Sequence, residues 1–167
     1  IMGTIGLTSQ LTISRAVELI GLGSNAGFVA TTNFGTTNGS KHLVGVQAVP
    51  TGTVSLSNLT LNSNANAYGV HAYTTTDGAD VRFSNVTMKN SRGAGLTVNG
   101  STVIATNLST EGNSWGGVNV DPGSGVVSPS VFTLNSGTLA ENTQIWSDGA
   151  NVNASSTVTV NAVGYTQ

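Results

Sequence analysis

Short segments in which apolar and polar residues alternate recur along this chain at intervals of between 22 and 28 residues. Alternation at every second residue is the pattern of a β-strand that buries one face. Four of these segments carry an asparagine at the same place, so they can be aligned on one another. The segments are Val54–Leu61, Val81–Met88, Val103–Thr110 and Val131–Asn135, and their asparagines are Asn58, Asn85, Asn107 and Asn135.

A second column of short apolar segments follows the first one with similar steps. Its members begin at Val46, Val70, Leu96, Val118 and Ile145. Turn-forming residues such as the Asn-Gly and Pro-Gly pairs lie between the strands. Two columns that repeat together are typical of a solenoid, in which each repeat stacks on the one before it.

We therefore predict an all-β fold, a right-handed parallel β-helix of about five to six rungs with about three strands in each rung. Residues 1–167 form a single domain in this prediction, with a long loop insertion at 23–41 in the first rung. A β-sandwich with Greek-key connections is the alternative, because its turns would recur at similar intervals. A sandwich gives no reason for asparagine to recur, whereas stacked asparagines in a solenoid form a hydrogen-bonded amide ladder.

The apolar positions of the two columns define the predicted core. It consists of Val54, Leu56, Leu59, Val70, Val81, Phe83, Val86, Leu96, Val103, Leu108, Val118 and Ile145. We expect the asparagine ladder to turn toward this interior, where glycans on its Asn-X-Ser/Thr sequences would conflict with packing. Lys89 and Glu111 fall at matching places on adjacent rungs, and we expect a weak surface ion pair between them.

The segment Leu11–Gly21, with the sequence LTISRAVELIG, resembles the opening rung of the pectate-lyase-like right-handed parallel β-helix superfamily. The later stretches Ser-Asn-Leu-Thr-Leu and Ser-Asn-Val-Thr-Met are similar to its inner rungs, and the resemblance covers residues 5–160. It implies the parallel β-helix architecture. It does not imply one activity, because that superfamily includes polysaccharide lyases and hydrolases, phage tailspikes, adhesins and surface-layer modules.

Charged residues make up only 7% of the chain, and the net charge is −2. A nucleic-acid binder needs a basic surface for the phosphates, and a membrane-surface binder needs a polybasic patch, so both classes are disfavoured. The sequence has no apolar run long enough to insert into a membrane. A surface of Ser, Thr, Asn and Gly is more usual outside the cell, so we expect an extracellular or cell-surface location. The start at Ile1 suggests a processed or excised product.

One pair of carboxylates is a candidate ligand-binding or metal-binding site. Asp121 and Asp148 each lie three residues after the start of a second-column segment, at Val118 and Ile145, and would be neighbours on successive rungs. Such a pair would take calcium, which prefers oxygen ligands, or it would cap the turns at Pro122 and Gly149. The basic residue of the superfamily's lyases and the His and Arg companions of its hydrolases have no counterpart here. We therefore expect no enzymatic activity, no obligatory cofactor, and calcium as the one candidate ligand ion.

The outward side chains of the second column form a candidate binding face. His71, Asn119 and Trp146 occupy one predicted row, and Tyr73 lies two residues further along its strand. Aromatic rings stack well on the apolar C–H faces of sugars, which favours carbohydrate as a ligand. The alternative for each residue is an ordinary solvated or packed side chain. Trp115, in a glycine-rich loop, is equally suited to covering an edge of the core.

From these features we predict a secreted structural protein that stacks end to end into an extracellular filament or surface layer. Near-absent charge favours this, because like charges at exposed strand edges are a usual defence against self-association. The partners would be copies of the chain itself. An adhesin or glycan-binding module excised from a larger surface protein is the alternative, and a polysaccharide lyase or hydrolase domain is the third.

Overall fold

The computed structural model describes residues 1–36, 41–74, 79–123, 126, 128–147 and 156–161. It is an all-β structure, and these residues contain no helix, hence none that could cross a membrane. The strands are β1 (Thr4–Leu7), β2 (Leu11–Ile13), β3 (Val17–Ile20), β4 (Gly27–Ala30), β5 (His42–Gln47), β6 (Gly52–Asn62), β7 (Tyr68–Tyr73), β8 (Ala79–Lys89), β9 (Ala94–Asn99), β10 (Thr102–Glu111), β11 (Gly116–Val120), β12 (Ser130–Leu134), β13 (Gly137–Leu139), β14 (Ile145–Ser147) and β15 (Ser156–Val160).

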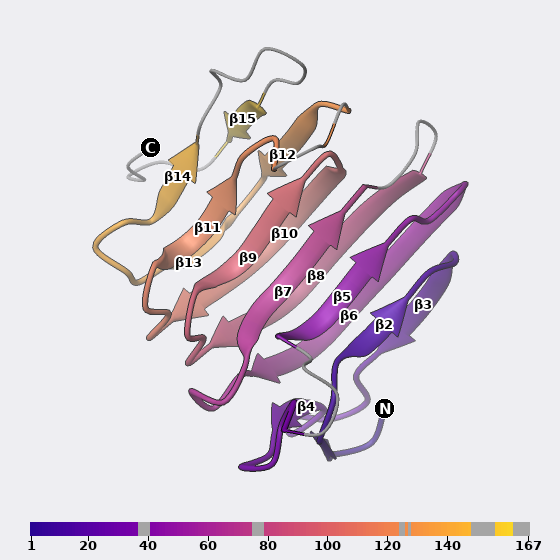
Figure 1. The fold of residues 1–167 in the computed structure, drawn as a ribbon, viewed down its shortest axis with the longest axis vertical. Helices are drawn as coiled ribbons and strands as arrows, with labels where there is room; N and C mark the ends of the chain where they lie inside the picture. The colour runs from indigo at the N-terminus through magenta and orange to yellow at the C-terminus, as the bar shows by residue number, and fades with distance from the viewer. Residues whose placement is uncertain (37–40, 75–78, 124–125, 127, 148–155, 162–167) are drawn as a thin grey trace.

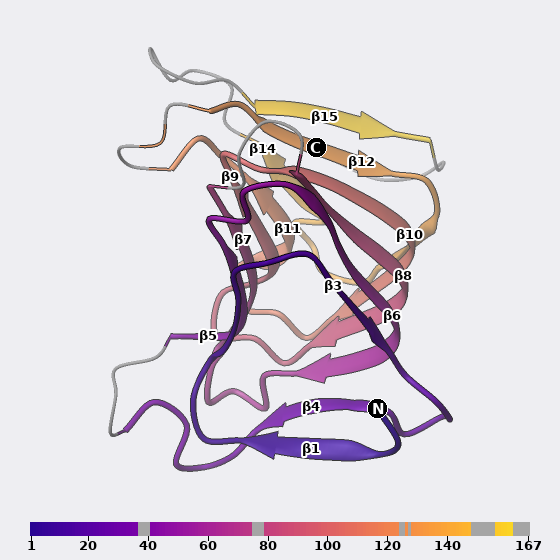
Figure 2. The same cartoon turned by 90° about the vertical axis from the view of Figure 1, so that its right-hand side faces the viewer.

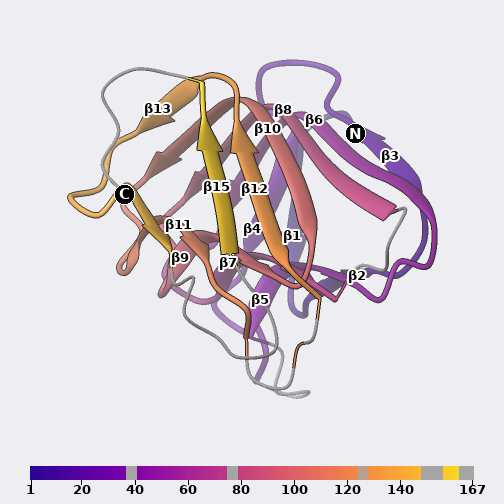
Figure 3. The same cartoon turned by 90° about the horizontal axis from the view of Figure 1, so that it is seen from above.

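The strands form two parallel sheets (Figure 1). The long-strand sheet has the order β1-β4-β6-β8-β10-β12-β15, with β3 paired to β6 and β13 paired to β10. The short-strand sheet has the order β14-β11-β9-β7-β5-β2. From β5 to β12 the chain passes alternately from one sheet to the other, and Figure 2 shows the two sheets as facing walls. The strands β12 and β15 lie at one end of the long-strand sheet and β1 at the other (Figure 3).

The core lies between the two sheets and is built from the apolar positions of each strand. All the residues predicted to fill it are at most 2% exposed, which confirms the inward positions of both columns. Phe83, Phe132 and Leu43 are among the largest fully buried side chains. Because the two sheets face one interior, the apolar side chains of each strand are buried against the opposite sheet and against the neighbouring strands in the stack.

The register differs from the prediction at two steps. Val44, not Val46, lies opposite Val70, a shift of two residues that keeps the same face inward. In β12 the shift is one residue: Phe132 lies opposite Val103, and the outward Val131 lies opposite Thr102. A one-residue shift exchanges the two faces of a strand. It occurs here because burying Phe132 and Leu134 removes more apolar surface from water than burying Val131 and Thr133 would.

The asparagine ladder lies outside the core, so its predicted inward orientation is wrong. Asn58, Asn85 and Asn107 are exposed and have φ values of 54°, 53° and 54°. Asparagine tolerates this left-handed conformation better than most residues do, because its short amide can bond locally. The residue bends each long strand, so that apolar residues on both sides of it, such as Leu56 and Leu59, point inward.

The segment predicted as a loop insertion at 23–41 is not wholly a loop. It contains β4, which pairs with β1 and with β6. Phe28, Ala30 and Phe34 from this segment are buried in the core. The short apolar run Gly27–Ala30 supplies enough buried surface to make a strand, and the surrounding Thr, Asn and Gly residues concealed that signal in the sequence.

Candidate functional site

A groove of about 330 Å³ lies on the outer face of the short-strand sheet. We call it the first groove, and its chief lining residues are His42, Tyr68, His71, Trp115, Asn119 and Asp121, with Lys41, Thr97 and Asn99. Aromatic rings, amides and a carboxylate around one hollow are the usual components of a small-molecule site. The described residues contain no group of three His, Cys, Asp or Glu side chains that could hold a metal ion.

The parallel register brings the groove residues together. His71 on β7 lies opposite Gly45 on β5 and Thr97 on β9, and Thr97 lies opposite Asn119 on β11. Since side chains alternate along a strand, residues in register point to the same face. Gly45 has no side chain, and the side chains of Gln10 and Gln47 occupy the space next to it.

A chain of hydrogen bonds crosses three strands on the floor of the groove. The Nε2 atom of His71 lies 2.7 Å from Oδ1 of Asn99. The amide of Asn99 donates from Nδ2 to the backbone oxygen of Asp121 at 2.8 Å and to its carboxylate Oδ1 at 2.9 Å. Because Asn99 uses its NH₂ group on Asp121, its oxygen must accept, and His71 donates from Nε2. In the neutral ring this leaves Nδ1 as the hydrogen-bond acceptor.

The two histidines of the groove stay neutral at physiological pH. Their ring centroids are 4.4 Å apart. Burial lowers the pKa of His42 from 6.5 to about 4, with further lowering by the neighbouring His71 and Lys41. Burial also lowers the pKa of His71, although its bond to Asn99 and the charge of Asp121 act in the opposite direction. A neutral imidazole has one donor and one acceptor nitrogen, and His71, whose N–H is bonded to Asn99, keeps its acceptor for a ligand hydroxyl.

An aromatic pair stands at one side of the groove. Tyr68 and Trp115 meet edge to face with ring centroids 5.3 Å apart, and Tyr68 also packs near His42 at 5.6 Å. The pair lies over Gly93, where an added Cβ atom would come within 2.5 Å of the Tyr68 ring and 3.2 Å of the Trp115 ring. Trp115 remains 63% exposed, so one of its faces is free to contact a ligand.

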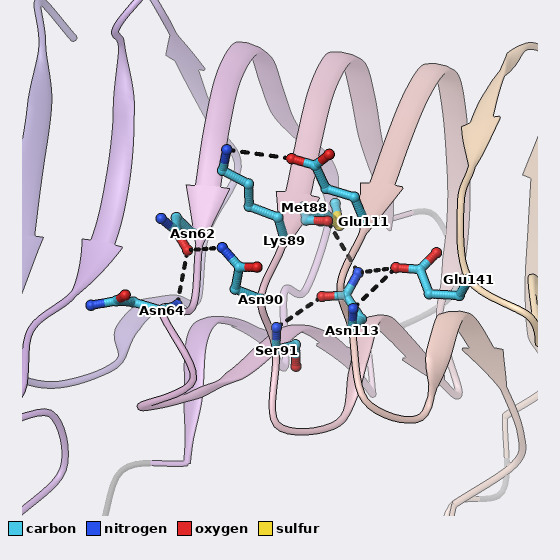
Figure 4. A network of polar contacts seen from close by, with 9 residues as sticks. All are labelled: Asn62, Asn64, Met88, Lys89, Asn90, Ser91, Glu111, Asn113 and Glu141. Carbon is cyan, nitrogen blue, oxygen red and sulfur yellow. Dashed lines mark hydrogen bonds and ion pairs between the residues drawn. The ribbon is translucent and has the colours of Figure 1, made fainter.

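A polar network fixes the turn that carries Trp115 (Figure 4). Asn113 donates from Nδ2 to Glu141 Oε1 at 2.6 Å and to the backbone oxygen of Met88 at 3.1 Å. Its Oδ1 accepts from the backbone N–H of Ser91 at 3.0 Å, and Thr110 donates to Glu141 Oε2 at 2.6 Å. Asn113 thus joins three successive turns of the chain, and Trp115 two residues later takes a defined position.

One polar atom of the groove has no partner among the described residues. The Oδ1 atom of Asn119 is buried and accepts no hydrogen bond within them. A buried acceptor without a donor costs about 1–3 kcal/mol. Asn119 is part of the groove lining, but this oxygen itself is closed off from a water-sized group.

The structure gathers some of the predicted site residues and separates others. His71, Asn119 and Asp121 line the first groove, and Tyr73 lies beside it with its ring 5.2 Å from that of His71. Trp146 is the strand neighbour of Asn119 but is not part of the groove lining. The groove also contains His42, Tyr68 and Trp115, which the predicted binding face did not include.

For the predicted calcium site, the described residues place no group of three His, Cys, Asp or Glu side chains around Asp121. The Oδ1 atom of Asp121 already accepts from Asn99 and from the backbone N–H of Gly123, at 2.7 Å for the latter, which is a turn-capping arrangement. Asp148 lies outside the described residues. Asp121 therefore acts within this part of the chain as a turn cap, and it also lines the first groove.

The ladder residues are only partly in register. Asn85 donates from Nδ2 to Asn58 Oδ1 and Asn107 donates to Asn85 Oδ1, both at 2.9 Å. Asn135 does not continue this row: its Nδ2 donates to Thr106 Oγ1 at 3.3 Å, and its Oδ1 accepts from Asn161 at 2.8 Å. The one-residue shift of β12 explains this, because it places Ser136 next to Asn107.

Comparison of this chain with protein-family models, with curated proteins and with solved structures finds no match.

Proposed function

We propose that this chain is an extracellular carbohydrate-binding module on a right-handed parallel β-helix, and that it binds sugars without turning them over. Two parallel sheets joined by alternating passes of the chain support the β-helix. The first groove supports the binding role. Localisation outside the cell rests on the low charge and on the composition rich in Ser, Thr, Asn and Gly.

The observation that carries the proposal is the meeting of Trp115 and Tyr68 with neutral hydrogen-bonding groups in one groove. An exposed indole face matches the C–H face of a sugar ring. The neutral His42 and His71, the side-chain amide of Asn119 and the carboxylate of Asp121 match hydroxyl groups at its rim.

A glycan array at pH 7.5, followed by titration calorimetry on the sugars that bind, tests this proposal. Trp115→Ala should weaken binding at least tenfold, a loss typical of a central aromatic contact. Trp146→Ala is the matched control, since Trp146 is also exposed and lies on the same sheet, outside the groove lining. It should change affinity less than twofold. Both variants should keep the melting temperature of the parent.

An array without any bound sugar would contradict the proposal, as would a loss of binding in Trp146→Ala but not in Trp115→Ala. Chromatography of bound oligosaccharides after prolonged incubation checks for turnover. Shortened products would show a lyase or hydrolase activity and overturn the statement that the module only binds.

End-to-end association is the second candidate function, and a different observation favours it. Among the described residues, Met2, Ile5 and Leu22 near the edge strand β1 are 85%, 46% and 62% exposed. Apolar side chains next to an unpaired strand edge are a common site of contact between chains. Such contacts between unlike ends generate filaments. Negative-stain electron microscopy across a concentration series tests this: threads of uniform width support it, and discrete particles at every concentration contradict it.

A further inference from the structure

A second groove of about 360 Å³ adjoins the first one. It is lined by the turn Gly112–Gly116 and by residues 140–143 of the following turn. Of the residues that the structure describes, Trp115 alone belongs to the lining of both grooves, so it lies at their junction. We propose, building on the carbohydrate-binding function above, that the ligand is an uncharged oligosaccharide of at least two units that extends across Trp115 from the first groove into the second.

The size of the two grooves argues for an extended ligand. Each lies near the lower end of the range of about 300–1,000 Å³ that small-molecule pockets occupy. A single sugar fills one hollow and leaves the other to water. A ligand that occupies both must pass the indole of Trp115, which is exposed and can support a sugar ring between the two hollows.

The second groove holds a carboxylate in a fixed position. Glu141 Oε1 accepts from Nδ2 and from the backbone N–H of Asn113, at 2.6 and 3.3 Å, and Oε2 accepts from Thr110 at 2.6 Å. A carboxylate offers about four acceptor positions, so these three bonds leave about one for a ligand. Because the network already holds the side chain still, a sugar hydroxyl can bond to it with little loss of conformational entropy.

The charges of the two linings favour an uncharged sugar. Among the described residues, Lys41 is the only Lys or Arg in either lining, against Asp121 in the first groove and Glu141 in the second. The histidines of the first groove add no positive charge at neutral pH, because burial lowers the pKa of both. An acidic sugar would therefore meet a lining without a surplus of positive charge. The free energy lost when its carboxylate leaves water would exceed the electrostatic attraction gained in the grooves.

The experiment measures affinity against ligand length. The probes are oligomers of one to six units of glucose, mannose, galactose and xylose, with oligomers of galacturonic acid as the charged comparison. In at least one neutral series, affinity should rise at least tenfold between one unit and four. The galacturonic acid oligomers should bind at least tenfold more weakly than the neutral oligomers of that series.

Glu141→Gln should reduce the gain with length, which is the ratio of the affinity for four units to the affinity for one unit, to less than threefold. Glu111→Gln is its matched control, because Glu111 is an exposed glutamate outside both linings, and it should keep the full gain. If Glu141→Gln fails to fold, the length series on the unaltered protein still decides, and Asn142→Ala in the exposed rim of the second groove replaces it.

The outcomes separate this inference from the function on which it rests. If one unit binds as tightly as four in every neutral series, the extended ligand is wrong and the binding module stands. Preference for galacturonic acid oligomers overturns the uncharged ligand alone. If no probe binds at any length, both the inference and the proposed function fail.

Discussion

The two sheets of this molecule stack their strands in the same parallel manner but carry different side chains on their outer faces. In the long-strand sheet, Thr60 on β6 lies opposite Thr87 on β8, which lies opposite Ser109 on β10, so one small hydroxyl residue repeats. In the short-strand sheet, the row that contains His71 changes type at each strand. A residue type that repeats on successive strands stabilises the contact between those strands, whereas side chains that differ from strand to strand are available to bind a ligand.

The core that both sheets share gives the largest expected effect. Phe83 on β8 is 1% exposed and is one of the largest buried side chains. Phe83→Ala should lower the free energy of unfolding by about 3–5 kcal/mol, since it removes apolar contacts and leaves a cavity. Ser84→Ala, at the next and outward position, should change it by less than about 0.5 kcal/mol. Urea unfolding followed by fluorescence measures both, and equal midpoints for the two variants would contradict the orientation of β8.

Much of this core was predictable from the sequence, because a strand that buries every second residue shows an alternating pattern of apolar and polar residues.

The outward orientation of the Asn85 side chain was not predictable in this way. The repeat of asparagine in the sequence is the same whether the amide points into the core or out to solvent. The left-handed φ of 53° at Asn85, which bends the strand, explains why this side chain is exposed. In β12 either Val131 and Thr133 or Phe132 and Leu134 can face the core. The local sequence pattern does not decide between these two alternatives, so the one-residue shift was not predictable from it.

The candidate site was predictable only where it follows the strand pattern. His71 and Asn119 belong to an alternating column, and the sequence identified both. His42 was missed because the predicted register aligned Val46 with Val70, whereas His42 lies opposite Tyr68 in the structure. Trp115 lies in a turn with no periodic signal. Its place depends on a hydrogen bond between residues 28 positions apart in the chain, Asn113 and Glu141, and such a contact exists only once the strands have stacked.

The asparagine ladder of the long-strand sheet gives the next effect. Asn85→Ala should lower the free energy of unfolding by about 2 kcal/mol, since it removes the bonds to Asn58 and Asn107 and places a Cβ-bearing residue without a polar group at positive φ. Asn85→Gly is the matched variant: it keeps the backbone conformation accessible and should cost about 1 kcal/mol. Thermal unfolding with both variants separates the two contributions. Equal losses would show that the amide bonds account for the whole effect.

The histidine pair of the short-strand sheet makes stability depend on pH. Between pH 6.5 and 4 the unfolded chain binds a proton at residue 42 that the folded protein does not, because the folded pKa of His42 is about 4. Stability is therefore full above pH 6.5 and falls as the pH drops toward 4. After allowance for the partial exposure of the ring, we expect a loss on the order of 1–2 kcal/mol.

Urea unfolding at pH 7.5 and at pH 4.5 measures that loss, and His42→Gln should make the dependence on pH shallower. Between pH 4.5 and pH 7.5 Asp80 does not contribute to the change, because its pKa lies below its ordinary value of 3.8. Burial raises this pKa, but hydrogen bonds from Thr53 and Arg82 outweigh that effect. A His42→Gln variant with the same slope as the parent would assign the dependence on pH to His71 or to another group.

The smallest effect belongs to the ion pair on the outer face of the long-strand sheet. Lys89 Nζ lies 3.4 Å from Glu111 Oε1, and the two residues are in register on β8 and β10. The side chains are 32% and 55% exposed, so water and salt screen the attraction. A double-mutant cycle with Lys89→Met and Glu111→Gln should give a coupling energy below about 0.5 kcal/mol that disappears at high salt. A coupling above about 1 kcal/mol would mean that this face, like the groove, uses side chains that do not repeat to hold a defined geometry.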